Sequence, residues 1–221
     1  MISDGDRIAV GLSGGKDSLA LMEILSERRA YVPIRYEVIA LHIDLGFEGG
    51  FSEPLEAYCE KKGYDLKVEY TDYGLIGHGA ENKENPCFLC SRLRRKRLFQ
   101  LADEYGCNKI ALGHNKDDII ETLFINMCYA GEISTMVPAQ RMFQNRLTVI
   151  RPLAYAEAGV IQRFASERRF PEFINPCPTA SVSKRSEIRD LLSRLYSSNR
   201  KIKGNIFRAL SHVRYEYLLK P

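Results

Sequence analysis

The fold is decided by the stretch Arg7-Ile8-Ala9-Val10-Gly11-Leu12-Ser13-Gly14-Gly15-Lys16-Asp17-Ser18, in which an apolar run leads into a glycine-rich loop and then into a helical pattern. Similar apolar runs recur along the chain at residues 37–43, 65–70, 109–112 and 147–150. Stretches with apolar residues at helical spacing separate these runs. Strands that alternate with helices form βαβ units with parallel strands. We therefore predict an α/β protein with a doubly wound, five-stranded parallel sheet.

The predicted helices divide the chain into a main domain and a short appendage. They cover residues 17–28, 52–62, 91–105, 117–129 and 157–169. The Pro-rich segment 170–179 and two further helical patterns follow. We predict an ATP-binding α/β domain over residues 1–170 and a helical appendage over residues 171–221.

Composition excludes several classes of protein. The 221 residues are 45% apolar and 27% charged, which fits one globular domain rather than a disordered chain. No apolar stretch approaches the ~20 residues that span a bilayer, and residues 1–9 lack the pattern of a signal peptide. We expect a cytoplasmic protein without a membrane partner. In that reducing compartment, six cysteines favour a metal or redox site over disulfides.

Positive charge is concentrated near the C-terminus. Between Lys184 and Arg214, nine Lys or Arg residues face only Glu187 and Asp190, for a net charge of +7. We expect this segment, including Arg185, Arg189 and Lys203, to hold a polyanion such as RNA. The alternative is a solvated helical face.

The loop Ser13-Gly14-Gly15-Lys16-Asp17-Ser18 is typical of an anion site. A turn between a strand and a helix exposes backbone N–H groups, paired glycines let the chain close around phosphate oxygens, and the serine hydroxyls add donors. Val10 and Asp17 exclude a Walker A loop, which requires Gly and Ser or Thr there. Lys16 and Asp17 suit a site that binds pyrophosphate with Mg²⁺. The alternative is a plain glycine turn.

This loop resembles the signature of the PP-loop, or N-type ATP pyrophosphatase, superfamily, which cleaves ATP between the α and β phosphates. The segment Gly113-His114-Asn115-Lys116-Asp117-Asp118 is similar to the second motif of its tRNA-modifying branch. The resemblance implies an adenine nucleotide alpha hydrolase-like fold in which Gly113, His114 and Asp117 approach ATP. It also implies that Asp117 or Asp118 is a Mg²⁺ ligand or a catalytic acid, although Asp117 could equally serve as a helix N-cap.

Three of the cysteines are expected to bind metal. Cys87 and Cys90 have the two-residue spacing of metal-binding thiols, and Cys177 lies between two prolines in a loop-like segment. Cys59 and Cys128 fall within predicted helices and Cys107 just after one, so we expect these three in the core. Three thiolates suit a [4Fe-4S] cluster with one open iron, whereas a zinc site would need Cys107 or a histidine as fourth ligand.

The resemblance then narrows to the tRNA 2-thiocytidine synthetase family. It rests on Cys87-Phe88-Leu89-Cys90-Ser91-Arg92-Leu93-Arg94-Arg95, on Glu121-Thr122-Leu123-Phe124-Ile125-Asn126-Met127 and on Arg151-Pro152-Leu153-Ala154-Tyr155. The family carries a PP-loop domain and an oxygen-sensitive [4Fe-4S] cluster on three cysteines, and it thiolates cytidine 32 of tRNA. This sequence has Asn115-Lys116 where His-Arg is common in the family.

A mechanism follows from these assignments. The C2 oxygen of a pyrimidine is a poor leaving group. Attack of this oxygen on the α phosphate of ATP would make it part of AMP, which leaves readily. We expect Lys16, Asp17 and Asp117 to assist catalysis, with Arg94 holding tRNA phosphate or developing charge. Arg92 and Arg95 could share the role of Arg94. The sulfur, from free sulfide or a cysteine desulfurase, would be carried as a persulfide or, as we favour, on the open iron.

Three other functions are compatible with parts of the sequence. An enzyme that attaches lysine to a tRNA cytidine would share the ATP motifs but has no use for the three cysteines. A zinc-stabilised RNA-binding module would be colourless and would not turn over ATP. A PP-loop enzyme could also insert or remove sulfur in a different base or in a small molecule, and a free base or nucleoside would need no basic tail. The oligomeric state, with a homodimer among the candidates, is left open by the sequence.

Overall fold

The computed structural model describes residues 1–179 and 184–219, which form two compact units. Unit 1 comprises residues 1–115 and 137–179, and unit 2 comprises residues 116–136 and 184–219. This division differs from the boundary that we predict at residue 170. The reason is that apolar side chains of segment 116–136 pack against those of the C-terminal helices.

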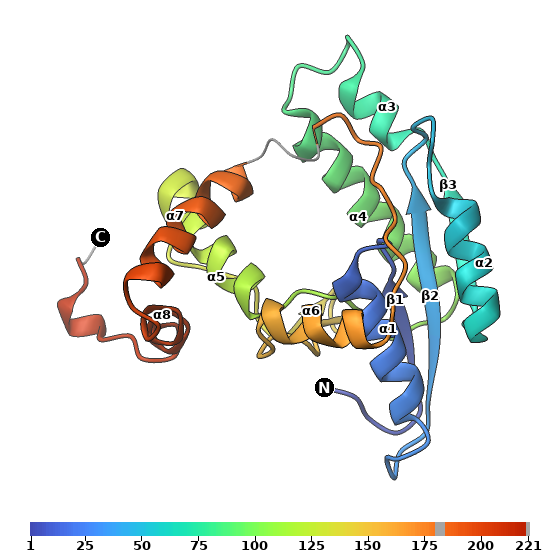
Figure 1. Cartoon of the computed structure of the whole chain (residues 1–221), viewed down its shortest axis with the longest axis horizontal. Helices are drawn as coiled ribbons and strands as arrows, with labels where there is room; N and C mark the ends of the chain where they lie inside the picture. Colours follow the sequence, from blue (N-terminus) through green and yellow to red (C-terminus); the bar gives the residue numbers. More distant parts are fainter. Residues whose placement is uncertain (180–183, 220–221) are drawn as a thin grey trace. The chain divides into compact units, whose positions relative to one another are not determined.

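Unit 1 is built on a six-stranded sheet with the order β3-β2-β1-β4-β6-β5 (Figure 1). Its strands are β1 (Asp6–Gly11), β2 (Tyr36–Asp44), β3 (Leu66–Tyr70), β4 (Lys109–Ala111), β5 (Ala139–Met142) and β6 (Leu147–Ile150). The α/β class and the five parallel strands are confirmed. The predicted strand number is corrected to six, because β5 pairs antiparallel to β6 at the edge. The first and fourth strands of the prediction are each shortened at the carboxyl end, where the functional loops begin.

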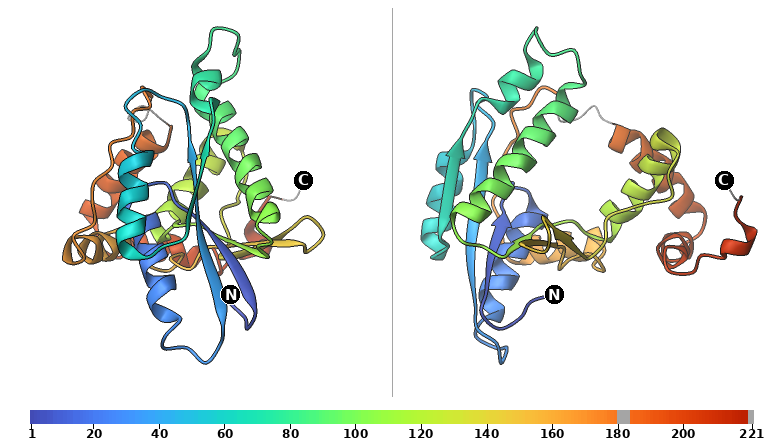
Figure 2. Two further views of the ribbon diagram at one scale, coloured as in Figure 1. Left: turned by 90° about the vertical axis from the view of Figure 1, so that its right-hand side faces the viewer. Right: turned by 180° about the vertical axis from the view of Figure 1, so that it is seen from behind.

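Helices cover both faces of this sheet, as expected for a doubly wound fold (Figure 2). The helices of unit 1 are α1 (Lys16–Arg28), α2 (Ser52–Lys62), α3 (Tyr73–His78), α4 (Pro86–Glu104) and α6 (Ala158–Glu167). Side chains alternate along a strand, so Ile8 and Val10 of β1 pack with α1, α2 and α6, whereas Ala9 faces α4. Both halves of the core therefore meet at β1, directly before the loop 13–18.

Helix α4 begins five residues earlier than predicted, which places Cys87 and Cys90 on its first turns. The Asn85 side chain accepts hydrogen bonds from the N–H groups of Cys87 and Phe88, and Pro86 occupies the first helical position. Both residue types favour a helix start at these positions. The cysteines are consequently held on a rigid element rather than on a loop.

The regular elements of unit 2 are all helices or helical turns in the part that the structure describes. It contains α5 (Lys116–Ile125), a π-helical turn (Asn126–Ala130), α7 (Lys184–Ser198), α8 (Ile202–Ala209) and a 3₁₀ turn (Tyr215–Tyr217). Buried Ile120 of α5 packs against Ile188 and Leu192 of α7, and Phe207 of α8 borders this small core. In the described part of the chain, the helices are too short or too polar to cross a membrane.

Candidate active site

The loop 13–18 lies where β1 ends and α1 begins, and its own serines fix its shape. The Ser18 hydroxyl accepts hydrogen bonds from the Ser13 backbone N–H at 3.2 Å and the Ser13 hydroxyl at 3.1 Å. It donates to the Gly15 carbonyl at 2.8 Å. No side chain caps α1, so the N–H groups at its N-terminus are available for an anion.

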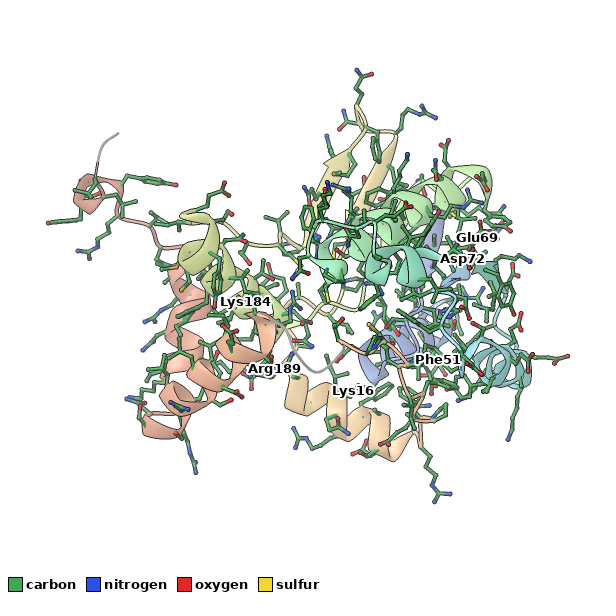
Figure 3. All side chains as sticks on the ribbon, turned by 90° about the horizontal axis from the view of Figure 1, so that it is seen from above. Lys16, Phe51, Glu69, Asp72, Lys184 and Arg189 are labelled. Atoms are coloured by element: carbon green, nitrogen blue, oxygen red, sulfur yellow. The ribbon has the colours of Figure 1, made fainter. Side chains whose placement is uncertain are left out.

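Gly14 is required by the local geometry of this loop. Its φ of +77° lies in the left-handed region, and a Cβ added there would come within 2.5 Å of the Phe51 ring. Phe51 stacks on Phe173 with 5.4 Å between ring centroids, and it also contacts the His42 ring. An aromatic wall therefore stands beside the phosphate loop; Figure 3 labels Phe51 together with Lys16.

The turn after β4 presses against the loop 13–18. A Cβ on Gly113 would lie 2.9 Å from the backbone of Asp17 and Ser18. The Asn115 amide donates to Asp17 Oδ1 at 3.3 Å, so the residue that stands where His is common in the family contacts the loop directly. The structure thus brings the two sequence motifs together at the carboxyl edge of neighbouring strands β1 and β4.

Lys16 and Asp17 form a pair on the exposed side of the loop. The Lys16 Nζ lies 3.4 Å from Asp17 Oδ2, with 39% and 29% of the two side chains exposed. An ion pair this accessible is weakly held, because water screens its charges. Both side chains can consequently turn toward a phosphate or a metal ion.

His42 is a buried residue of this region that the sequence does not single out. Its Nδ1 donates to the Leu12 carbonyl at 2.8 Å, immediately before the loop. Burial lowers the pKa of His42, while the hydrogen bond to Leu12 and the charge of Asp44 act in the opposite direction. The imidazole is therefore neutral at pH 7 and supports the loop as a hydrogen-bond donor.

Two of the three predicted metal-binding cysteines, Cys87 and Cys177, contact the same residue, Thr179. The Thr179 hydroxyl lies 3.2 Å from Cys87 Sγ and 3.5 Å from Cys177 Sγ. His78 Nε2, at the end of α3, lies 3.1 Å from the same hydroxyl. Residues from α3, α4 and the segment after α6 therefore meet in one place within unit 1.

Cys90 belongs to the same group of thiols. Burial raises the pKa of Cys90, the charge of Arg94 acts against this, and Cys177 and Cys87 raise it further. Cys90 follows Cys87 by three residues on α4, and Cys177 shares the Thr179 contact with Cys87, so we call these three residues the cysteine site. Neighbouring thiolates repel one another, so a cation placed among them would stabilise their charged form.

The donor chemistry of the cysteine site, three thiols, suits an iron-sulfur cluster. Within residues 1–179 and 184–219, no three His, Cys, Asp or Glu side chains converge closely enough to hold one ion. A [4Fe-4S] cluster takes one thiolate per iron, so its ligands surround a larger body. Thiols are the ligands that such a cluster takes, and the Thr179 hydroxyl lies between two of them, Cys87 and Cys177.

The remaining cysteines lie elsewhere. Cys59 and Cys107 are buried, as predicted. The prediction that Cys128 lies in the core is wrong, because α5 ends at Ile125 and Cys128 is exposed on the π-helical turn.

Arg94 connects the cysteine site to the loop region electrostatically. It follows Cys90 by one helical turn on α4, and its charge lowers the pKa of both Cys90 and His42. The positive charge of Arg94 therefore acts on one residue of the cysteine site and on one residue that supports the phosphate loop.

In unit 2, the predicted functional charges neutralise one another. Asp117 pairs with Lys203 at 2.6 Å, Asp118 with Arg185 at 3.0 Å, and Glu121 with Arg189 at 2.8 Å. Figure 3 labels Lys184 and Arg189 on α7. Three cations that we expect to hold a polyanion thus form ion pairs with α5, and their binding to RNA stays a prediction. Gly113 and His114 belong to unit 1, whereas Asp117 belongs to unit 2.

Known proteins share this architecture and these motifs. A PP-loop domain model matches residues 3–195. Proteins named tRNA-cytidine(32) 2-sulfurtransferase from Geobacter sulfurreducens and Geotalea daltonii are both 40% identical to this chain, cover 99% of it, and are themselves covered to 86% and 88%. The U34-tRNA thiolase NcsA from Methanococcus maripaludis, solved with its [4Fe-4S] cluster, is 28% identical with a TM-score of 0.77 over 96% of this chain and 74% of its own. The chain therefore belongs to the PP-loop tRNA thiolation family.

Proposed function

We propose that this protein is a cytoplasmic sulfurtransferase that uses ATP to activate the C2 carbonyl of cytidine 32 in tRNA and replaces its oxygen with sulfur. One observation supports the proposal: Cys87 and Cys177 contact the same hydroxyl, and Cys90 follows Cys87 on α4, in the unit that also contains the phosphate loop. A protein that only binds RNA needs no such group of thiols. An enzyme that attaches an amine to tRNA does not need one either. The names of the relatives support the same activity.

The loop would hold the triphosphate of ATP. The backbone N–H groups of Gly14 and Lys16, at a helix start without a side-chain cap, would donate to the phosphates, while the bonded hydroxyls of Ser13 and Ser18 hold the shape of the loop. Gly113 leaves room for the backbone to approach, and His114 follows it on the same turn. Lys16 would neutralise the departing pyrophosphate, and Asp17 would contribute a carboxylate oxygen to Mg²⁺.

The residues of the phosphate loop would assist the difficult step of the reaction, which is the conversion of the C2 oxygen into a leaving group. The cytidine oxygen would attack the α phosphate, which breaks the bond to pyrophosphate and turns the oxygen into part of an AMP leaving group. Attack of sulfur at C2 would then expel AMP. Charge builds up between the α and β phosphates in the first step, where Lys16 lies within reach on an exposed side chain.

The cysteine site would supply the sulfur chemistry. A [4Fe-4S] cluster on Cys87, Cys90 and Cys177 would offer one coordination position that no protein thiol fills. Arg94 would stabilise negative charge on the incoming sulfur donor or on the tRNA, because it lies one helical turn from Cys90. The donor would be free sulfide or a cysteine desulfurase.

The test is anaerobic reconstitution with iron and sulfide, followed by reaction with ATP and a tRNA transcript carrying cytidine 32. We expect 2-thiocytidine in the digested tRNA, with AMP and pyrophosphate released in step. A transcript with uridine at position 32 is the matched control. Release of ADP, or thiolation that ignores the base at position 32, would contradict the proposal.

A further inference from the structure

A groove outside the sites described above runs along α4 beside the β5–β6 hairpin. Its volume is about 760 Å³, within the range of ligand-binding clefts. All of its lining residues belong to unit 1. We call it the α4 groove and define it by Phe88, Arg92, Arg95, Lys96, Phe99 and Phe143.

One stripe of α4 supplies most of this groove. Residues 88, 92, 95, 96 and 99 follow each other at three- and four-residue steps, which places them on one face of the helix. Cys87, Cys90 and Arg94 follow the same steps on a neighbouring stripe. The groove therefore begins one residue away from the cysteine site and extends about 16 Å along the helix.

Aromatic rings form the apolar part of the groove. Phe99 is half-buried and packs edge-on against Phe143 with 5.5 Å between centroids. Phe143 is 54% exposed and Phe88 is 58% exposed, an unusual degree for such apolar rings. The Arg92 guanidinium lies 5.5 Å from the centre of the Phe88 ring. Ring faces are thus presented to solvent next to cations.

The hairpin holds Phe143 in a strained conformation. Phe143, Gln144 and Asn145 all have positive φ values, of 49°, 55° and 71°. A bulky residue such as Phe rarely adopts this region, and such strain is commonly found at functional sites. The backbone strain therefore falls on a residue whose ring is largely exposed rather than packed in the core.

The charge of the groove is positive and only partly neutralised. Arg92 pairs with Glu84 at 3.3 Å and Arg146 with Asp103 at 3.2 Å. Arg95 and Lys96 form no ion pair with any described residue, so two cations face the groove without a carboxylate partner. Unpaired cations among exposed aromatic rings are what single-stranded nucleic acids recognise, through phosphate contacts and base stacking.

We propose that the α4 groove holds an unpaired nucleotide of the tRNA, with its base stacked on Phe143 and its phosphate bound by Arg95 and Lys96. This inference rests on the proposed function, because a tRNA must be the substrate. A nucleotide held here would fix the RNA strand next to the base that enters the cysteine site. A helical strand would not fit this role, because its bases are already stacked on each other.

The test measures the affinity of the anaerobically reconstituted enzyme for the tRNA transcript by fluorescence anisotropy. Phe143→Ala should weaken binding about ten-fold, within the range found for one base-stacking contact, and Phe143→Trp should retain it. Lys96→Gln should reduce the slope of log Kd against log salt by about 0.7. Tyr31→Ala and Lys61→Gln remove an exposed ring and an exposed cation elsewhere on unit 1, so they should change neither value.

A second variant distinguishes the loss of a binding contact from a folding defect. Phe143→Gly removes the ring and relieves the left-handed φ, so it should lose affinity while the melting temperature stays the same or rises. Transcripts with one abasic loop nucleotide at a time locate the contact. The effect of Phe143→Ala should vanish for the nucleotide whose base is stacked there.

Unchanged affinity in Phe143→Ala and Lys96→Gln would overturn the proposal. So would variants that bind tRNA normally but lose an acidic protein partner, since the groove would then be a protein surface. Thiolation of cytidine 32 is measured separately. Failure of the proposed function would show as missing product with tRNA binding intact, whereas failure of the groove proposal would show as unaltered affinity in the variants.

Discussion

Gly113 is the residue at which the second motif meets the phosphate loop. The atoms nearest to its missing Cβ are backbone atoms of Asp17 and Ser18, which cannot rotate away as a flexible side chain would. Glycine is therefore required here for close approach, although its own φ is ordinary. The contact keeps the start of α1 at a fixed distance from the turn after β4.

We predict that Gly113→Ala will displace the phosphate loop. The added methyl group would lie 2.9 Å from three backbone atoms, and overpacking of this kind typically costs about 1–3 kcal/mol. Affinity for ATP, measured by calorimetry, should fall, and the melting temperature should drop. Gly159→Ala is the matched control, since nothing lies within 4 Å of that position in α6. The control should be neutral or stabilised by up to about 1 kcal/mol. Equal ATP affinity in the two variants would contradict the argument.

His42 makes stability depend on pH. Burial lowers the pKa of His42 below its ordinary value of 6.5, so below that pH the unfolded chain binds a proton that the folded chain resists. Stability contributed by the neutral imidazole is present above pH 6.5 and is lost as the pH falls. Urea unfolding between pH 7.5 and 5.5 should show this loss, at most about 1.4 kcal/mol per pH unit for one group. In His42→Gln the free energy of unfolding should fall less over the same pH range. If the variant and the wild type show the same pH dependence, His42 is not the group responsible.

At the scale of elements, α5 and α7 are held together by opposite charges as well as by apolar contacts. Glu121 is buried and its carboxylate pairs with Arg189 at 2.8 Å, while Arg185 pairs with Asp118 at 3.0 Å. A buried carboxylate that loses its ion-pair partner destabilises the folded state. The basic character of α7 therefore stabilises unit 2, in addition to any role toward RNA.

We predict that Arg189→Glu will destabilise unit 2. The substitution places a second carboxylate beside buried Glu121, which keeps only the longer 3.8 Å contact with Arg185, and we expect a loss of about 1–3 kcal/mol, the range for a buried polar group that loses its hydrogen-bond partner. Arg194→Glu is the control on the same helix, because Arg194 is exposed and forms no ion pair with any described residue. Urea unfolding followed by circular dichroism separates the two. If both variants unfold alike, the ion pair with Glu121 contributes nothing.

The elements that were predictable from sequence are those with strong periodicity. The apolar runs of β1 and β2, and the helical spacing of α1 and α6, required no tertiary information. Strand β5 was missed because Ala139–Met142 is largely exposed and has no alternating pattern. The start of α4 was missed although Asn85 and Pro86 are recognised helix-start residues. The roles of His42, His78 and Thr179 depend on contacts between distant segments, which no local pattern encodes.

At the scale of the whole molecule, the cysteine site closes a long loop of the chain. It joins the start of α4 to the segment after α6, so that a bound cluster would hold two parts of unit 1 together that are distant in sequence. Metal binding of this kind contributes directly to folding free energy, because the unfolded chain has no preformed site.

We predict that loss of the cluster will loosen only the segments that surround the cysteine site. Cys177→Ser should abolish bound iron, and hydrogen exchange should then accelerate in residues 73–92 and 170–179. Exchange in β1, β2 and β4 should stay slow, because these strands are buried between helices on both faces. Cys128→Ser removes an exposed thiol of unit 2 and should retain both iron and protection. Stoichiometric zinc without iron in the wild type, or iron retained in Cys177→Ser, would show that these three cysteines do not form the cluster site.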